Sequence, residues 1–244
     1  MNRRSIALTF VVCLLVGAAA LAPRIAQAQD YHHFADERRC GIANCLNVVS
    51  NVAFLSAGIA GLAVAWRRRS YALFFAGTLL TTFGSAYYHL SPDNARLVWD
   101  RLPIVLSLSA LTAAIVGERV SAHAERRVLW PLLALAAAGV LWWHWTERHG
   151  AGDLRLYALV QFGCLLVIGA ILALYPATGG SSGWLVAGLT AYGVAKLFEL
   201  LDAPLLHATA TLVSGHSLKH LCAAAAVGCV ARHCRRNRPV HLIV

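Results

Sequence analysis

The sequence predicts an all-helical membrane protein in which seven transmembrane helices form a bundle, preceded by a hydrophobic N-terminal segment. Of its 244 residues, 59% are hydrophobic and only 13% are charged, so the chain is far more apolar than a soluble domain. Apolar runs of about 20 residues recur along it, and an α-helix needs that length to cross a bilayer. Arginines cluster at the ends of alternate runs. Together these observations indicate an integral membrane protein.

The first 28 residues have the pattern of a secretory signal peptide. A positive start is followed by an apolar core over residues 6–21, and Ala26-Gln27-Ala28 places small residues one and three positions before Gln29. The core is also long enough to remain as an uncleaved signal anchor. Either outcome sends residue 29 to the outside of the membrane, so residues 29–47 form a polar external segment.

Seven apolar runs follow, and each is close to the length of a membrane span. They cover residues 48–66, 71–90, 99–117, 128–145, 154–175, 184–201 and 208–231. Together they make a predicted transmembrane domain over residues 48–231. The remaining residues, 232–244, form a basic tail.

Basic residues mark one side of this predicted bundle. The clusters within 67–69, 119–127 and 232–238 follow the first, third and seventh runs, so an odd number of spans places them on one side. By the positive-inside rule this side and the C-terminus are cytoplasmic, and the mature N-terminus is outside. We expect a multi-pass protein of the plasma membrane, which in a bacterium is the inner membrane. The same distribution accounts for the net charge of +10 without a nucleic-acid partner, and no protein partner is expected.

Two histidines stand four residues apart near the start of the last run. On a helix, His216 and His220 would lie one above the other, about 6 Å apart between Cβ atoms, which suits two ligands of one metal ion. An imidazole at membrane depth is costly and needs a reason. A pair of interfacial histidines at a helix end explains this short stretch equally well.

The predicted topology brings further polar residues to the same depth. His89 ends the second run, Ser85 precedes it by one turn, and Asp100 begins the third run. The second run goes outward and the third and seventh go inward, so all of these residues lie at outer helix ends. Three neutral imidazoles with an open position for water are the arrangement of a catalytic zinc site. Asp100 could hold that water, and Ser85 could donate to an oxyanion.

Simpler roles also fit these residues. The Ser85 hydroxyl could bond back to a helix carbonyl, and Asp100, three residues before Pro103, could cap a helix. On the sixth run, Glu199 and Asp202 share a face with Lys196. We expect one of these two acids to orient a histidine or to pair with a lysine, and plain structural ion pairing is an equal alternative.

With these residues in place, the sequence resembles the alkaline ceramidase family, part of a seven-helix hydrolase superfamily that also includes the progestin and adipoQ receptors. The matching motifs are Asn47-Val48-Val49-Ser50-Asn51, Ser85-x3-His89, Asp100-Arg101-Leu102-Pro103 and Gly215-His216-x3-His220. The resemblance implies zinc bound by His89, His216 and His220, with Asp100 and Ser85 as catalytic residues. It also implies hydrolysis of the N-acyl bond of ceramide or a ceramide-like lipid to a fatty acid and a sphingoid base or amine. The alternative is a membrane receptor or stress-response protein with a structural metal site.

The external segment departs from the family pattern. Eukaryotic members hold calcium there with closely spaced acids, whereas here Asp30, Asp36 and Glu37 are interleaved with basic residues. Asn44 stands where an acid is expected. Calcium is therefore not expected, and His32 and its neighbour His33 are expected to be exposed to solvent.

The seven cysteines are scattered and include no Cys-x-x-Cys pair, which argues against a thiolate metal site. Cys40 and Cys45 lie close together in the external segment, and this spacing leaves one disulfide open.

Overall fold

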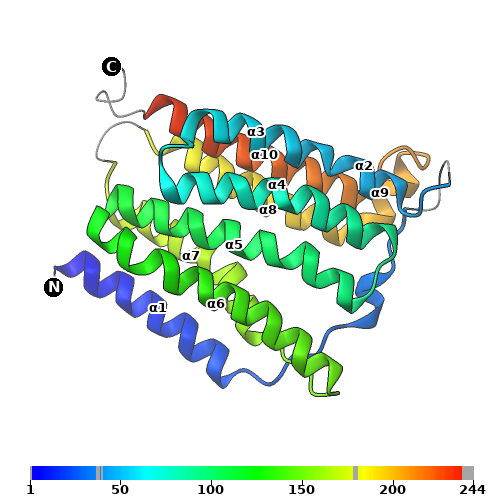
Figure 1. Cartoon of the computed structure of the whole chain (residues 1–244), viewed down its shortest axis with the longest axis horizontal. Coiled ribbons are helices and arrows are strands. Elements are labelled where there is room, and N and C mark those ends of the chain that lie inside the picture. Colours follow the sequence, from blue (N-terminus) through cyan, green and yellow to red (C-terminus); the bar gives the residue numbers. More distant parts are fainter. Residues whose placement is uncertain (1, 37–38, 40, 178–180, 238–244) are drawn as a thin grey trace.

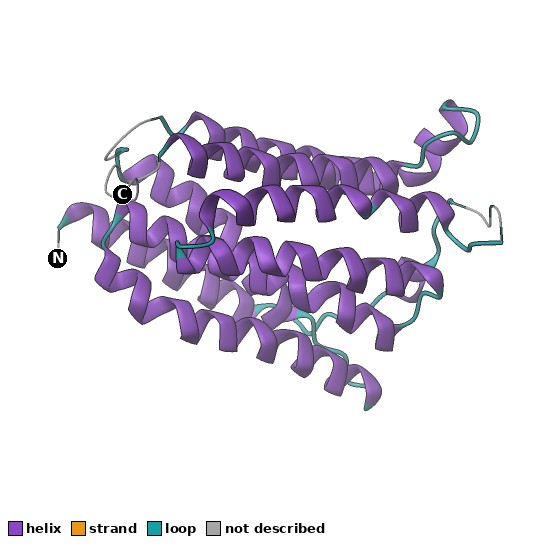
Figure 2. Ribbon diagram, turned by 45° about the horizontal axis from the view of Figure 1, so that its top comes forward, coloured by secondary structure: helices purple, strands orange, loops and turns teal. Residues whose placement is uncertain are grey.

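The computed structural model describes residues 2–36, 39, 41–177 and 181–237 of the chain. Within these residues the regular structure is helical, and Figure 2 shows helices joined by loops and no strand. The long helices lie side by side in one bundle (Figure 1). The predicted fold class, an all-helical polytopic membrane protein, is therefore confirmed.

Each of the seven predicted spans corresponds to helical structure, and the first is divided between two helices. In chain order the elements are α1 (Arg3–Leu21), the 3-10 helix η1 (Gln29–His32), α2 (Cys45–Ser50), α3 (Val52–Ala65), α4 (Arg69–Leu90), α5 (Asn94–Arg119), α6 (Ala122–Arg148), α7 (Arg155–Leu174), α8 (Gly183–Leu200), α9 (Asp202–Ala208) and α10 (Gly215–Arg236).

Five helical segments among the described residues are long and apolar enough to cross a membrane: α1, the joined α2 and α3, α5, α6 and α7. A sixth is formed if α8 and α9, which meet at a bend of 79°, count as one span. The helices α4 and α10 have 22 residues each but fall short of the same hydropathy. These two helices carry His89, His216 and His220, and their polar side chains contribute to that shortfall.

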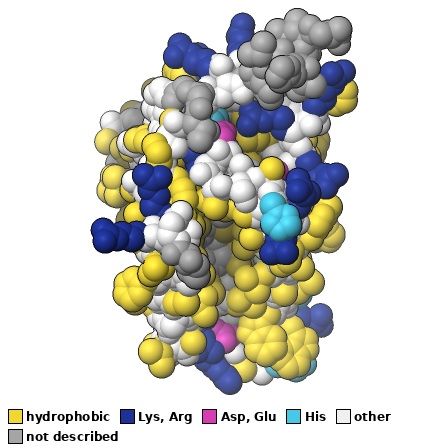
Figure 3. Space-filling view, turned by 90° about the vertical axis from the view of Figure 1, so that its left-hand side faces the viewer, with side chains coloured by type: hydrophobic (Ala, Val, Ile, Leu, Met, Phe, Trp, Pro, Cys, Tyr) yellow, Lys and Arg dark blue, Asp and Glu magenta, His cyan; other side chains and the backbone are white. Residues whose placement is uncertain are grey.

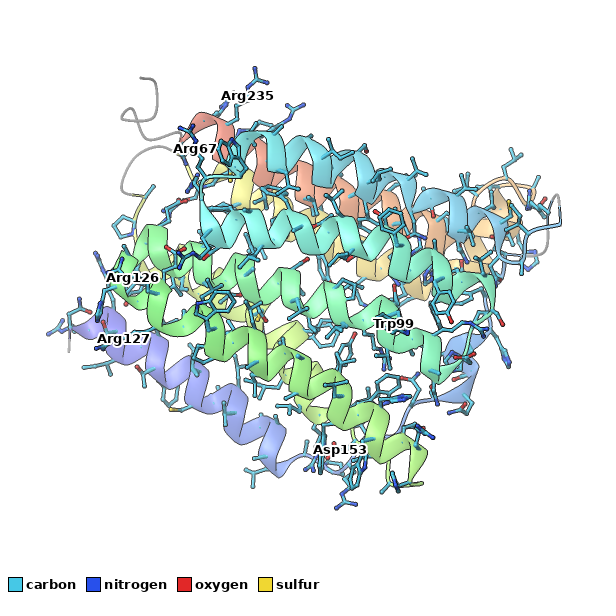
Figure 4. All side chains as sticks on the ribbon, in the orientation of Figure 1. Arg67, Trp99, Arg126, Arg127, Asp153 and Arg235 are labelled. Carbon is cyan, nitrogen blue, oxygen red and sulfur yellow. The ribbon has the colours of Figure 1, made fainter. Side chains whose placement is uncertain are left out.

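Basic residues gather at one end of the bundle, which we call the arginine-rich end. Figure 4 labels Arg67, Arg126, Arg127 and Arg235 there, whereas Asp153 lies at the opposite end. Figure 3 looks onto the arginine-rich end and shows Lys and Arg side chains around it. Both described termini lie at this end (Figure 1). The charge asymmetry predicted from the sequence is thus a property of the folded bundle.

Two clusters of apolar side chains fill the bundle. The larger one packs the half nearer the arginine-rich end and includes Phe75, Ile115 and Ile171. The smaller one packs the opposite half and includes Tyr88 and Trp143. The predicted site residues lie beside this second cluster, at what we call the histidine end.

The N-terminal segment packs against the bundle. Helix α1 lies along α7 and contains no buried residue. After α1 the chain crosses the histidine end, where the backbone N–H of Leu154 donates to the carbonyl of Ile25 at 2.8 Å and the Gln27 side chain is buried. Removal of residues 1–28 as a signal peptide stays a prediction.

The last helix begins later than the sequence predicted. Helix α9 ends at Ala208, and Ala210 and Thr211 have φ angles of 49° and 65°, so the chain leaves the helical conformation there. Ser214 then caps α10 by accepting the N–H of Ser217 at 3.0 Å. The predicted start at residue 208 is wrong because the apolar pattern continues through this turn.

We expect the histidine end to face the outside of the cell and the arginine-rich end to face the cytoplasm, because arginines are retained on the cytoplasmic side of a membrane. Reporter fusions after residue 35 and after residue 237 measure the two locations separately. The expected result is an external signal at residue 35 and a cytoplasmic signal at residue 237. Two signals from the same compartment would contradict the predicted orientation.

Candidate metal centre

Three histidines meet at the histidine end and form what we call the histidine cluster: His89, His216 and His220. One nitrogen of each ring can be chosen so that all three lie within 4.8 Å of one another, and all three side chains are buried. The ring centroids are 4.7 Å apart for His89 and His216, 5.2 Å for His89 and His220, and 4.9 Å for His216 and His220. The structure therefore brings the three predicted ligands together.

The donors of the histidine cluster fit a metal ion. The Nδ1 atom of His89 is buried and has no hydrogen-bond partner among the described residues, which is costly for a polar atom away from water. His220 uses Nδ1 toward the Ser50 hydroxyl at 2.8 Å, which leaves Nε2 for another partner. Lys219 lies 3.3 Å from Nε2 of His216, and this long contact would have to yield to a metal at that nitrogen. Three imidazoles without a fourth protein ligand are typical of catalytic zinc.

The start of α10 positions two members of the cluster. His216 and His220 are one turn apart, so they point to the same side of the helix. A Cβ atom on Gly215 would lie 2.4 Å from the Phe198 carbonyl oxygen and 2.6 Å from that of Leu201. Glycine therefore lets α10 begin directly against the bend between α8 and α9.

Two polar residues of α2 support the cluster. Both belong to the motif over residues 47–51, but neither was predicted from the sequence to have a role at the site. Asn47 is fully buried, and its Oδ1 accepts the Ser214 hydroxyl at 2.9 Å. Ser50, three residues later on the same face, contacts His220. Polar residues spaced three apart in an apolar run were the available signal.

Asp100 and Ser85 meet on the neighbouring helices α5 and α4. Both are buried and line the same cavity, where the Ser85 side chain lies beside the Asp100 carboxylate. The alternative of Asp100 as a helix cap is wrong, because α5 already begins at Asn94 and Asp93 is its cap.

A close approach of α4 and α5 makes this meeting geometrically feasible. A Cβ atom on Gly84 would lie only 2.0 Å from the carbonyl oxygen of Trp99. Gly84 precedes Ser85 and Trp99 precedes Asp100, so this close contact of the two helices stands beside the two site residues.

Glu199 and Asp202 both contact α10, in different ways. Glu199 forms ion pairs with Lys196 and Lys219. Asp202 accepts the backbone N–H of His216 at 2.8 Å and that of Ala35 at 3.0 Å. Neither carboxylate contacts an imidazole of the cluster. Asp202 thus anchors the main chain at a candidate ligand, and Glu199 is the shared ion-pair partner of two lysines.

The external segment folds over the histidine cluster. The Phe34 ring lies 4.6 Å from the ring centroids of both His89 and His216. His32 is half-buried, with Nδ1 2.9 Å from the Tyr88 hydroxyl. The expectation that His32 is solvent-exposed is therefore wrong, whereas His33 is exposed as predicted. Neighbouring polar side chains, which a sequence pattern does not reveal, provide the partners of His32.

Asp36 uses its carboxylate to stabilise the start of α2. It accepts the backbone N–H of Asn47 at 3.1 Å. Burial raises the pKa of the Asp36 carboxyl, and bonds from the backbone of Leu46 and Asn47 oppose that rise. Glu37, a calcium candidate, lies outside the described residues. So does Cys40, one of the two cysteines of the possible Cys40–Cys45 disulfide.

A cavity of about 470 Å³ opens beside the cluster and extends through the bundle. Ser85, Asp100 and His220 line it at the histidine end. Its far end is lined by apolar side chains, among them Ile115 and Val230. A polar end next to candidate ligands and a long apolar interior suit a molecule with a polar group and a hydrocarbon chain.

Comparison with known proteins agrees with this arrangement. The family model described as Ceramidase matches residues 38–234, which include all seven predicted spans and every predicted site residue. A search of curated proteins found no match to the chain.

We expect Gly84→Ala to destabilise the protein, because a methyl group at the contact of α4 and α5 would overpack it at a cost of roughly 1–3 kcal/mol. Gly169→Ala is the matched control, since a Cβ atom there meets nothing within 4 Å. Thermal unfolding of both variants in detergent measures the difference. Equal melting temperatures for the two would contradict the close approach.

Proposed function

Since the chain belongs to the ceramidase family, whose activity is hydrolysis of the ceramide amide bond, we propose that it is a zinc-dependent intramembrane amidase. The observation that carries this proposal is that His220 of the histidine cluster, Asp100 and Ser85 line the polar end of one largely apolar cavity. His89, His216 and His220 are the proposed ligands.

Zinc held by the histidine cluster would supply a Lewis acid and a bound water whose pKa is lowered to about 7. The residues of the chain supply the rest of the chemistry. We assign Asp100 as the general base that takes the proton of the attacking water and then delivers it to the leaving amine. Its burial keeps competing bulk water away from this proton transfer.

Ser85 is assigned to the oxyanion. While Asp100 is ionised, the neighbouring Ser85 hydroxyl would donate to that carboxylate. Once Asp100 has taken a proton, it can donate to the Ser85 oxygen, which frees the serine proton for the oxygen of the tetrahedral intermediate. A donor that becomes free as negative charge develops stabilises the transition state more than the bound substrate.

The cavity supports a lipid substrate. An acyl chain within it would contact apolar side chains from α5, α7, α8 and α10. Each buried methylene contributes roughly 0.8 kcal/mol of binding, which a soluble amide without a long chain cannot obtain. We therefore propose ceramide or a similar N-acyl lipid as substrate, entering at the outer face of the plasma membrane, with fatty acid and sphingoid base or amine as products.

The alternative is a receptor or stress-response protein with a structural metal site. A structural zinc site has four protein ligands and needs neither an additional carboxylate nor a cavity. The buried pair of Asp100 and Ser85 and the adjoining cavity therefore favour the enzyme.

Removal of any one proposed ligand should release the metal. We expect about one zinc per purified chain, as in other three-histidine sites, and loss of most of it in His89→Ala, His216→Ala and His220→Ala. Asp100→Asn should retain zinc, because this residue is assigned to the water. Elemental analysis of the purified variants measures this. Full zinc occupancy in His216→Ala would reject the ligand set.

The purified, zinc-loaded protein should release fatty acid from an N-acyl sphingoid base, and chelation of zinc should abolish the reaction. Asp100→Asn should lower the rate by roughly 10²- to 10⁴-fold, the usual contribution of a general base. Mass spectrometry of lipids incubated with each protein provides the measurement. If none of a panel of ceramides and other N-acyl lipids is hydrolysed, the receptor alternative replaces the amidase.

A further inference from the structure

One buried cation at the histidine end has no place in the proposed reaction. Arg101 on α5 is only 5% exposed and lines the cavity. Its guanidinium lies against three aromatic rings, with its Cζ atom 4.3 Å from the centroid of Trp143, 4.6 Å from that of Tyr157 and 5.4 Å from that of Tyr31. Aromatic faces stabilise the charge but accept no conventional hydrogen bond from the edge of the guanidinium.

The hydrogen-bond donors of Arg101 are mostly unused. Nη2 donates to the side-chain oxygen of Gln27 at 2.6 Å. Nε and Nη1 are buried and have no hydrogen-bond partner among the described residues. Leaving donors of a charged group unpaired away from water is costly, so their presence beside a cavity points to a ligand.

The charged residues around the cavity leave one positive charge in excess. The charged residues that line the cavity in the described part of the chain are Asp100, Arg101, Lys196, Glu199 and Lys219. Glu199 pairs with both lysines, and Asp100 lies within electrostatic range of Lys219 and Arg101 but forms a salt bridge with neither. Arg101 forms no ion pair with any described carboxylate. Three cations against two carboxylates favour one additional negative group in this space.

We propose that Arg101 binds a carboxylate at the polar end of the lipid, a subsite that rests on the proposed function. A guanidinium presents parallel N–H groups in a planar fork, which matches the two oxygens of a carboxylate. The group has two sources: an acidic head attached to the amide nitrogen, as in an N-acyl amino acid, or the fatty acid that hydrolysis releases. Gln27 offers one neutral oxygen at the same fork and does not neutralise the charge.

Binding to the full-length, zinc-loaded Asp100→Asn protein in lipid nanodiscs tests this subsite without turnover. The probes are N-palmitoylglycine, N-palmitoylethanolamine and palmitate. The first two share the chain and the amide and differ in a carboxylate against a hydroxymethyl group. We expect at least about tenfold tighter binding of one or both acidic lipids than of the ethanolamine, the usual effect of a charge-assisted hydrogen bond. Preference for N-palmitoylglycine identifies the head as the source, and preference for palmitate identifies the product.

Substitutions of Arg101 in the same background decide its role. Arg101→Gln should remove the preference for acidic lipid, and Arg101→Lys should keep part of it, since lysine retains charge without the fork. Arg96→Gln is the matched control on α5, because Arg96 pairs with Asp93 and does not line the cavity. Unchanged affinity for both acidic lipids in Arg101→Gln overturns the proposal.

Two further results keep the conclusions separate. If Arg101→Gln does not fold, the binding of the three lipids is measured with the Asp100→Asn protein and with its Arg101→Lys variant. Equal affinity of both proteins for all three lipids overturns the subsite. Hydrolysis and zinc content of the wild-type protein are measured independently. Absence of hydrolysis together with arginine-dependent binding would reject the amidase and support the subsite. Hydrolysis by the wild-type protein, together with acidic-lipid binding that does not depend on Arg101, would support the amidase and reject the subsite.

Discussion

The candidate metal centre depends on how the first turn of α10 is held. A helix that begins within a bundle leaves its first N–H groups without helical partners, and water does not supply them there. Asp202 accepts the N–H of His216, and Ser214 accepts that of Ser217. Asn47 accepts in turn the Ser214 hydroxyl. Because these bonds fix the first turn, they also fix the direction of His216 and, one turn later, of His220.

The same bonds connect the site to three distant parts of the chain. Asp202 stands at the bend between α8 and α9 and also accepts the N–H of Ala35 in the external segment. Asn47 belongs to α2, whose start is held by Asp36. The external segment, the bend and α10 therefore share one hydrogen-bond network. Phe34 precedes Ala35, which belongs to that network, and its ring lies against two histidines. Geometry at the histidine end is a property of this network and not of any single helix.

Polar residues at the site are accommodated by the apolar helices around them. Helix α10 packs between α3 and α8, and α4 packs between α3 and α5. Helices α4 and α10 do not reach the hydropathy of a membrane span by themselves, and their three histidines are buried against protein instead of facing lipid. The cavity follows the same division, with ionisable side chains at the histidine end and apolar side chains toward the arginine-rich end. An amphipathic lipid would enter it in one orientation.

The sequence by itself determined most of the helices, the charge asymmetry and the positions of the three candidate ligands. Hydropathy, arginine placement and the spacing of His216 and His220 are local properties, and a helix converts spacing directly into a shared face. Only the tertiary structure decided where α10 begins, which groups hold Asn47 and His32, and that Arg101 lies among aromatic rings with unused donors. Those outcomes depend on contacts between segments far apart in the chain. Such contacts leave no repeating pattern in the sequence. A polar group that is buried away from water must pair with whichever group the fold places beside it, and that group can come from any part of the chain.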